Sequence, residues 1–263
     1  MQLELEGDTA VVTASSSGLG KASAKALGAE GANVVLNGRD ESRLEAAAEE
    51  IRSEVSGHVI VHPGDITDPK AISALVDRTV SEFGGIDHVV TSAGGPPPMR
   101  PLEPSDETWY DTFDLLVMSV VRLIRESATH LRADGGGSVV HITSMAAKEP
   151  GPTNALSGTV RPSVVGFEKM LSTELAPDVR VNAVLPGAHD TPRIQEVFED
   201  GVERGEYDTY EAAQKARTEE IPLDSIGDPD AFGAMVAFLC SPQASYITGV
   251  AVPIDGGSGS TMF

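Results

Sequence analysis

The sequence is poor in cysteine and has no long apolar run. Its one cysteine, Cys240, cannot form an intramolecular disulfide and lies in the apolar run 231–240, so we expect a buried filler rather than a nucleophile. The six histidines show no metal-ligand spacing, and we predict no metal site. No run of about 18 apolar residues occurs, and no basic segment followed by an apolar one opens the chain, which predicts a cytoplasmic protein.

Basic residues are also scarce. Lysine and arginine number 19 against 40 acidic residues, which gives a net charge of -21 and a pI near 4.5. Such a surface repels nucleic acid and anionic membranes, so we expect neither as a partner. Carboxylates crowd the expected helix surfaces, as at Asp40, Glu41 and Glu45, and favour a halophilic protein whose self-repulsion is screened by concentrated salt. An acidic mesophilic protein is the alternative.

Short apolar, β-branched runs alternate with amphipathic stretches of helical length, a pattern typical of βαβ units around a parallel sheet. Seven strands are expected, at residues 10–14, 33–37, 59–62, 88–91, 138–143, 180–185 and 250–254. The intervening apolar stripes are Leu44, Ala48, Ile51 and Val55, then Ile72, Val76, Val80 and Phe83. We predict an α/β fold, one doubly wound Rossmann domain over residues 1–263, with a substrate lid at about 188–222.

The first expected strand is followed by three serines, Ser15, Ser16 and Ser17, and then by Gly18-Leu19-Gly20 at the start of an alanine-rich helix. Glycine lets the backbone approach a pyrophosphate, and a helix N-terminus offers unpaired N–H groups and a partial positive charge. The loop therefore predicts a dinucleotide site, against the alternative of a simple tight strand-to-helix turn.

At these residues the sequence resembles the short-chain dehydrogenase/reductase family. Residues 13–20 resemble its first motif, Thr-Gly-x-x-x-Gly-x-Gly, with Ala14 in place of the first glycine. Four further segments resemble family motifs in the same order, the first three of them implied to contact the dinucleotide: Asp65-Ile66, Ser92-Ala93-Gly94, Pro186-Gly187 with Thr191, and the C-terminal stretch from Ile247 to Gly257. The resemblance implies a dinucleotide-dependent oxidoreductase and a homo-oligomer, a tetramer or dimer, because the C-terminal strand commonly lies in a tetramer interface.

The end of the second strand bears on which dinucleotide is bound. An acidic residue there would bind the adenosine ribose hydroxyls, whereas a basic residue would accept a 2′-phosphate. The chain has Gly38 at the usual acidic position, and Arg39 follows it. We therefore predict that NADP(H) is preferred over NAD(H). The alternative is that Arg39 pairs with a carboxylate of the following helix.

The resemblance also implies a catalytic set of Ser, Tyr, Lys and Asn, from which the chain departs. Ser144 matches the Ser that positions the substrate oxygen. The expected positions of the Tyr and of the Lys four residues later hold Ser157 and Arg161, and the Asn position falls on Leu116. Ser144, Ser157 and Arg161 are our candidate catalytic residues.

The departure matters because an aliphatic hydroxyl is a weaker acid than a phenol of pKa about 10, and arginine stays protonated to above about 12. Both serines can still hydrogen-bond a carbonyl oxygen, and the arginine can hold ribose hydroxyls and favour a developing oxyanion. Substitute proton donors would be Lys148, His189, Tyr207 or Tyr210, each with the alternative of a surface or packing residue. Pro162 predicts a local kink beneath the site.

The sequence thus predicts an atypical dehydrogenase/reductase that transfers hydride between NADP(H) and a small carbonyl or alcohol. One alternative is a catalytically silent dinucleotide-binding protein that senses redox state or holds a partner. Another is an enzyme of isomerisation or elimination on the same scaffold. Trp109, Met118 and Phe198 would suit a partly apolar substrate, which the sequence does not identify further.

Overall fold

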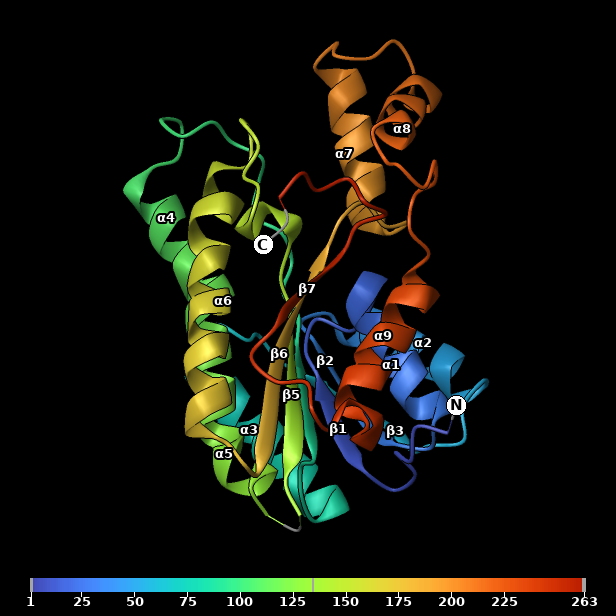
Figure 1. The fold of residues 1–263 in the computed structure, drawn as a ribbon, viewed down its shortest axis with the longest axis vertical. Helices are drawn as coiled ribbons and strands as arrows, with labels where there is room; N and C mark the ends of the chain where they lie inside the picture. Colours follow the sequence, from blue (N-terminus) through green and yellow to red (C-terminus); the bar gives the residue numbers. More distant parts are fainter. Residues whose placement is uncertain (1, 134, 262–263) are drawn as a thin grey trace.

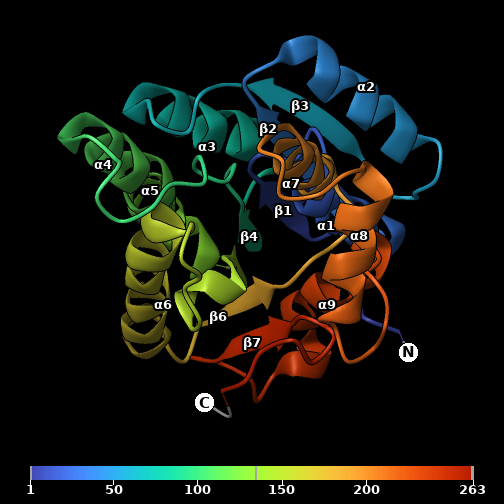
Figure 2. The ribbon, with the colours of Figure 1, turned by 90° about the horizontal axis from the view of Figure 1, so that it is seen from above.

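A computed structural model describes residues 2–133 and 135–261. Seven parallel strands form one sheet in the order β3-β2-β1-β4-β5-β6-β7 (Figures 1 and 2). The strands are β1 (Thr9–Val12), β2 (Asn33–Gly38), β3 (Val59–Pro63), β4 (His88–Thr91), β5 (Gly137–Ile142), β6 (Val179–Pro186) and β7 (Ala251–Ile254). The predicted fold class is confirmed. β1 ends at Val12 rather than at Ala14, because Ala14 takes a positive φ of 47° and leaves the extended conformation.

Helices cover both faces of the sheet, as a doubly wound fold requires. The first face carries α1 (Gly18–Ala29), α2 (Glu41–Arg52) and α9 (Pro229–Cys240), and the second carries α3 (Pro69–Phe83), α5 (Ser119–Leu131) and α6 (Ala155–Glu174). Successive strand residues point to opposite faces, so Val12 packs into the first core and Val11 into the second. The predicted stripes on α2 and α3 lie in these cores.

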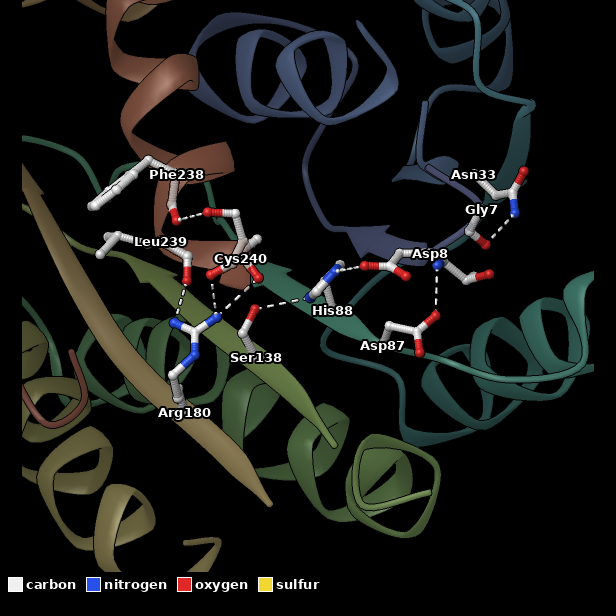
Figure 3. A network of polar contacts seen from close by, with 12 residues as sticks. Gly7, Asp8, Asn33, Asp87, His88, Ser138, Arg180, Phe238, Leu239 and Cys240 are labelled. Carbon is white, nitrogen blue, oxygen red and sulfur yellow. Dashed lines mark hydrogen bonds and ion pairs between the residues drawn. The ribbon is translucent and has the colours of Figure 1, made fainter. Parts of the chain in front are cut away.

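The amino-terminal ends of the strands are joined by a polar network (Figure 3). His88 lies between Ser138 Oγ at 2.9 Å and Asp8 Oδ2 at 3.0 Å, and the Asp87 carboxylate accepts from the Thr9 N–H. The Arg180 guanidinium donates to three carbonyls where α9 ends, those of Leu239, Cys240 and Ser241. A cation at a helix C-terminus satisfies free carbonyls and opposes the helix dipole, so this network is structural.

Two further helices, α7 (Pro192–Glu203) and α8 (Tyr210–Glu219), lie within the predicted lid and project beyond the opposite, carboxyl edge of the sheet (Figure 1). Their own apolar contacts include an edge-to-face pair between Phe198 and Tyr210. The short helix α4 (Asp106–Phe113) leads through a π-helical turn, η1 (Asp114–Met118), into α5.

Cys240 is buried at 1% exposure, and burial raises the pKa of its thiol to about 11, as suits a core residue. No cluster of three or more potential metal ligands occurs in residues 2–133 and 135–261. Within the same ranges, no helix combines the length and apolarity that crossing a bilayer requires.

Candidate functional site

The carboxyl ends of β1, β4, β5 and β6 bring the predicted motif segments to one edge of the sheet. Thr13 links the first two segments, because its Oγ1 donates to the Ser92 carbonyl at 2.7 Å and accepts from the Ser92 N–H at 2.8 Å. Ala93 and Gly94 follow at the end of β4. Parallel α/β folds bind ligands at this edge, at the point between β1 and β4 where the strand order reverses direction.

The loop between β1 and α1 requires its two glycines. Gly18 has a φ of +57°, and a Cβ at Gly20 would lie 2.6 Å from the Ala14 carbonyl oxygen, which no other residue could accept. The first residue of α1 is Gly18, and the first turn carries no acidic side chain. A pyrophosphate can therefore closely approach the N-terminus of α1, where no acidic side chain offsets the partial positive charge of the helix.

The three serines of this loop differ in role. Ser15 is fully buried, and its Oγ bonds to the Val12 carbonyl and accepts from the Asn37 N–H. These bonds fix the loop to β2 and engage the Ser15 hydroxyl within the protein, so a cofactor contact at Ser15 stays a prediction. Ser17 makes no side-chain capping bond at the start of α1, so its hydroxyl is available, and Ser16 Oγ lies 3.6 Å from where a Cβ of Gly38 would stand.

The residues expected at the adenine end lie close together. Asp65 accepts hydrogen bonds from the N–H and Oγ1 of Thr67, and these bonds, with the nearby Arg39 charge, lower the pKa of its carboxyl. Arg39 is exposed and forms no ion pair or side-chain hydrogen bond with the described residues, which argues against the alternative of pairing with α2. Ile66 lines a small cavity together with Thr13 and Ser92.

The structure brings the predicted catalytic residues together where β5 ends. Ser157 Oγ accepts the Arg161 Nε–H at 3.0 Å, and Arg161 Nη1 donates to the Thr143 carbonyl at 2.9 Å. Ser144 adjoins that carbonyl and accepts from the Ala146 N–H at the start of the 3₁₀ turn η2 (Met145–Ala147). α6 runs unbroken through Pro162, and the local kink expected there stays a prediction.

Arg161 is only 8% exposed. Burial, and to a smaller extent the neighbouring Arg193 charge, lowers the pKa of its guanidinium to about 10, which still leaves it protonated at neutral pH. Leu116, at 3% exposure in η1, lines a small cavity with Thr91, Thr143 and Arg161. The position expected for a relay amide is therefore apolar.

The four substitute donors make their contacts elsewhere. Lys148 Nζ lies 3.5 Å from the Ala251 carbonyl, and His189 packs edge-on against Phe232, with burial lowering its pKa. Tyr210 contacts Phe198, and a Cβ at Gly201 would lie 3.0 Å from the Tyr207 ring, so both tyrosines pack within the segment 188–222 predicted as a lid. No hydrogen bond between described residues joins any of the four to Ser144, Ser157 or Arg161.

The segment after β6 closes against the dinucleotide loop. β6 ends at Pro186, the Gly187 N–H donates to the Ile254 carbonyl, and a Cβ at Gly187 would lie 2.8 Å from Asp255 Cα. Thr191 side-chain atoms lie 3.6 Å from where a Cβ of Gly18 would stand. Pro186, Gly187 and Thr191 thus border the same opening as the loop.

Sequence reasoning missed Arg193, in the first turn of α7. Its Nη2 donates to the Pro96 carbonyl at 3.0 Å, and its Nε lies 3.2 Å from a Cβ built at Gly95. It also missed Glu149, whose carboxylate accepts from the N–H groups of Ser260 and Thr261. Neither residue belongs to a local motif, and both contact segments distant in the sequence.

The fold and this edge define a dinucleotide-binding protein of the Rossmann type. A family model described as Enoyl-(Acyl carrier protein) reductase matches residues 13–259. Tropinone reductase-like 3 of Erythroxylum coca is 35% identical over 261 residues, covering 98% of this chain and 95% of the relative. 3beta-Hydroxysteroid dehydrogenase 1 of Eggerthella lenta is 34% identical, covering 97% and 94%.

A solved structure of L-sorbose reductase from Gluconobacter frateurii, complexed with NADPH and L-sorbose, superimposes with a TM-score of 0.94 at 32% identity and full coverage of both chains. The chain belongs to the short-chain dehydrogenase/reductase family and is an NAD(P)-dependent oxidoreductase. These relatives speak against the catalytically silent alternative.

Proposed function

We propose that the protein is an NADP(H)-preferring reductase of small carbonyl compounds, or a dehydrogenase of the corresponding alcohols. In this proposal Ser157 and Arg161 act in place of a Tyr-Lys pair. The observation that carries the proposal is the 3.0 Å hydrogen bond from Arg161 Nε to Ser157 Oγ. This bond uses an acceptor site of the hydroxyl and leaves its O–H free to donate to a carbonyl oxygen.

In this mechanism Ser144 and Ser157 hold the carbonyl oxygen by two hydroxyl donors. When bound, NADPH supplies the hydride for the carbonyl carbon. Charge that develops on the oxygen is stabilised through Ser157 by the buried guanidinium, whose effect is strong because water is largely excluded. The proton comes from Ser157 Oγ, which recovers it from solvent, so the phenol of the family pattern is not required.

The cofactor would lie across the edge of the sheet. The Gly18 to Gly20 loop and Ser17 would hold its pyrophosphate. The exposed Arg39, which forms no ion pair with a described carboxylate, would accept a 2′-phosphate. The absence of a carboxylate at Gly38 supports this assignment, because a negative charge there would repel the phosphate. The NADPH complex of the L-sorbose reductase is in keeping with it.

The direct test is a turnover assay of the purified protein in molar KCl with NADPH or NADH and a panel of ketones, sugars and acyl thioesters. NADPH oxidation that depends on the carbonyl compound supports the proposal. Binding of NADPH without turnover of any compound would overturn it.

We further infer a halophilic, cytoplasmic homo-oligomer, a tetramer or dimer, with residues 188–222 as a substrate lid. The net charge of -21 supports the first inference, and the projection of α7 and α8 over the carboxyl edge supports the lid (Figure 1). We expect the protein to bind a small carbonyl or alcohol as its substrate and to bind neither nucleic acid nor membranes. The proposed chemistry does not require a metal ion.

A further inference from the structure

Arg161 is a buried cation without a carboxylate partner. It is 8% exposed, and no carboxylate of the described residues lies within 4.0 Å of its guanidinium nitrogens. Its two hydrogen bonds go to neutral oxygens, those of Ser157 and Thr143. A buried charge without a counter-charge is costly, so it is expected where a ligand supplies the missing charge.

The guanidinium also has unused donors. A guanidinium carries five N–H groups. The structure provides acceptors for Nε and Nη1 only, so both N–H groups of Nη2 have no partner among the described residues. Among the described residues, the fully enclosed side-chain atoms without partners belong to Asn37, Ser127, His141 and Glu168, so Nη2 of Arg161 is not fully enclosed. Arg161 also lines a small cavity with Ser92 and Thr143, at the edge where the candidate catalytic residues meet.

A second guanidinium reaches the same opening from the base of the lid. Arg193 spans from α7 to the Pro96 carbonyl after β4, and it is close enough to Arg161 to lower the pKa of that guanidinium. Its own partner, Glu196, is exposed and forms only a surface pair at 3.1 Å, which contributes little. In a chain of net charge -21, two neighbouring arginines thus create a local positive potential at the site.

We propose that the substrate is a keto acid, or the corresponding hydroxy acid, whose carboxylate lies one or two bonds from the reacting carbon and binds Nη2 of Arg161. The carbonyl oxygen then lies at Ser144 and Ser157, and Arg193 attracts the anion to the opening. A guanidinium binds a carboxylate by charge-assisted hydrogen bonds. These bonds raise the affinity for the substrate and also fix the orientation of its carbonyl group. This inference rests on the proposed carbonyl reductase function and names its substrate class.

The test compares 2-oxobutanoate with its methyl ester and with 2-butanone, using NADPH in molar KCl. For the native protein we expect kcat/KM for the acid to exceed that for the ester by about tenfold or more, the magnitude of one charge-assisted hydrogen bond. Arg161→Lys should lower the acid-to-ester ratio by about tenfold, and Arg193→Gln should lower it by a smaller factor. Arg204→Gln removes a lid cation at the far end of α7 and should leave the ratio unchanged.

A binding measurement separates this inference from the proposed function. Calorimetry of the NADP⁺-loaded protein with oxamate, a non-reducible carboxylate, should show binding that Arg161→Lys weakens, with thermal melts verifying that the variant folds. Equal reduction of acid and ester refutes the inference and leaves the reductase function standing. Oxamate binding without reduction of any carbonyl refutes the function and supports the anion site, and the absence of both refutes both.

Discussion

Replacement of Ser157 by alanine tests the central hydrogen bond of the site. The change removes the only side-chain acceptor that the described residues offer to Arg161 Nε and one of two hydroxyls at the carbonyl position. Loss of one preorganised donor to a developing oxyanion typically lowers kcat by about 10² to 10³, or about 2.7 to 4 kcal/mol. We expect a loss of this size, because Ser144 and the buried guanidinium remain.

The assay is steady-state NADPH oxidation with a carbonyl substrate found in the panel, together with fluorescence titration of NADPH. The dissociation constant for NADPH should change by less than about threefold, since the proposed function places Ser157 at the substrate oxygen rather than at the Gly18 to Gly20 loop. Ser163→Ala, an exposed position on the same helix, is the matched control and should retain native turnover. Native kcat in Ser157→Ala would refute the role of Ser157 as proton donor and direct attention to solvent.

Four further predictions concern the cofactor, salt, pH and the structural network. Arg39→Asp should weaken NADPH by roughly tenfold more than NADH in parallel titrations, and equal losses would make Arg39 structural. Melting temperature should rise steeply between 0.01 and 1 M salt as the Debye length falls from about 30 to about 3 Å; a flat profile would contradict the halophilic interpretation. Burial raises the pKa of Glu168 to about 7 from its usual 4.5, so its contribution to stability is complete below about pH 4.5 and is lost as pH rises through 7. Glu168→Gln should reduce this pH-dependent decline in the free energy of unfolding by roughly 1 to 3 kcal/mol, as measured by denaturant unfolding at several pH values. Glu174→Gln, at an exposed position of the same helix, should leave the decline unchanged. Arg180→Met leaves three carbonyls without their donor and should lower the free energy of unfolding by about 2 to 4 kcal/mol; a change under about 0.5 kcal/mol would show that water replaces the guanidinium.

The sequence by itself determined the sheet, the dinucleotide loop and the position of Arg39, the arginine that we propose selects the cofactor. These features are local: a strand buried on both faces is a short apolar run, a covering helix has its own period, and a tight phosphate loop needs glycine. Gly20 illustrates this, because the close approach of Ala14 that excludes any Cβ is made within seven residues. Family spacing likewise singled out Ser144, Ser157 and Arg161 as candidates, and these residues lie together where β5 ends.

Only the tertiary structure decided what those side chains contact. The hydroxyl of Ser15 is turned to β2, and Arg193 reaches the loop after β4 from the beginning of α7. Lys148 and His189, expected near the reacting oxygen, point to β7 and Phe232 instead. The physical reason is that a side chain's partners across the fold depend on how distant elements pack, and packing is a property of the whole core rather than of any local pattern.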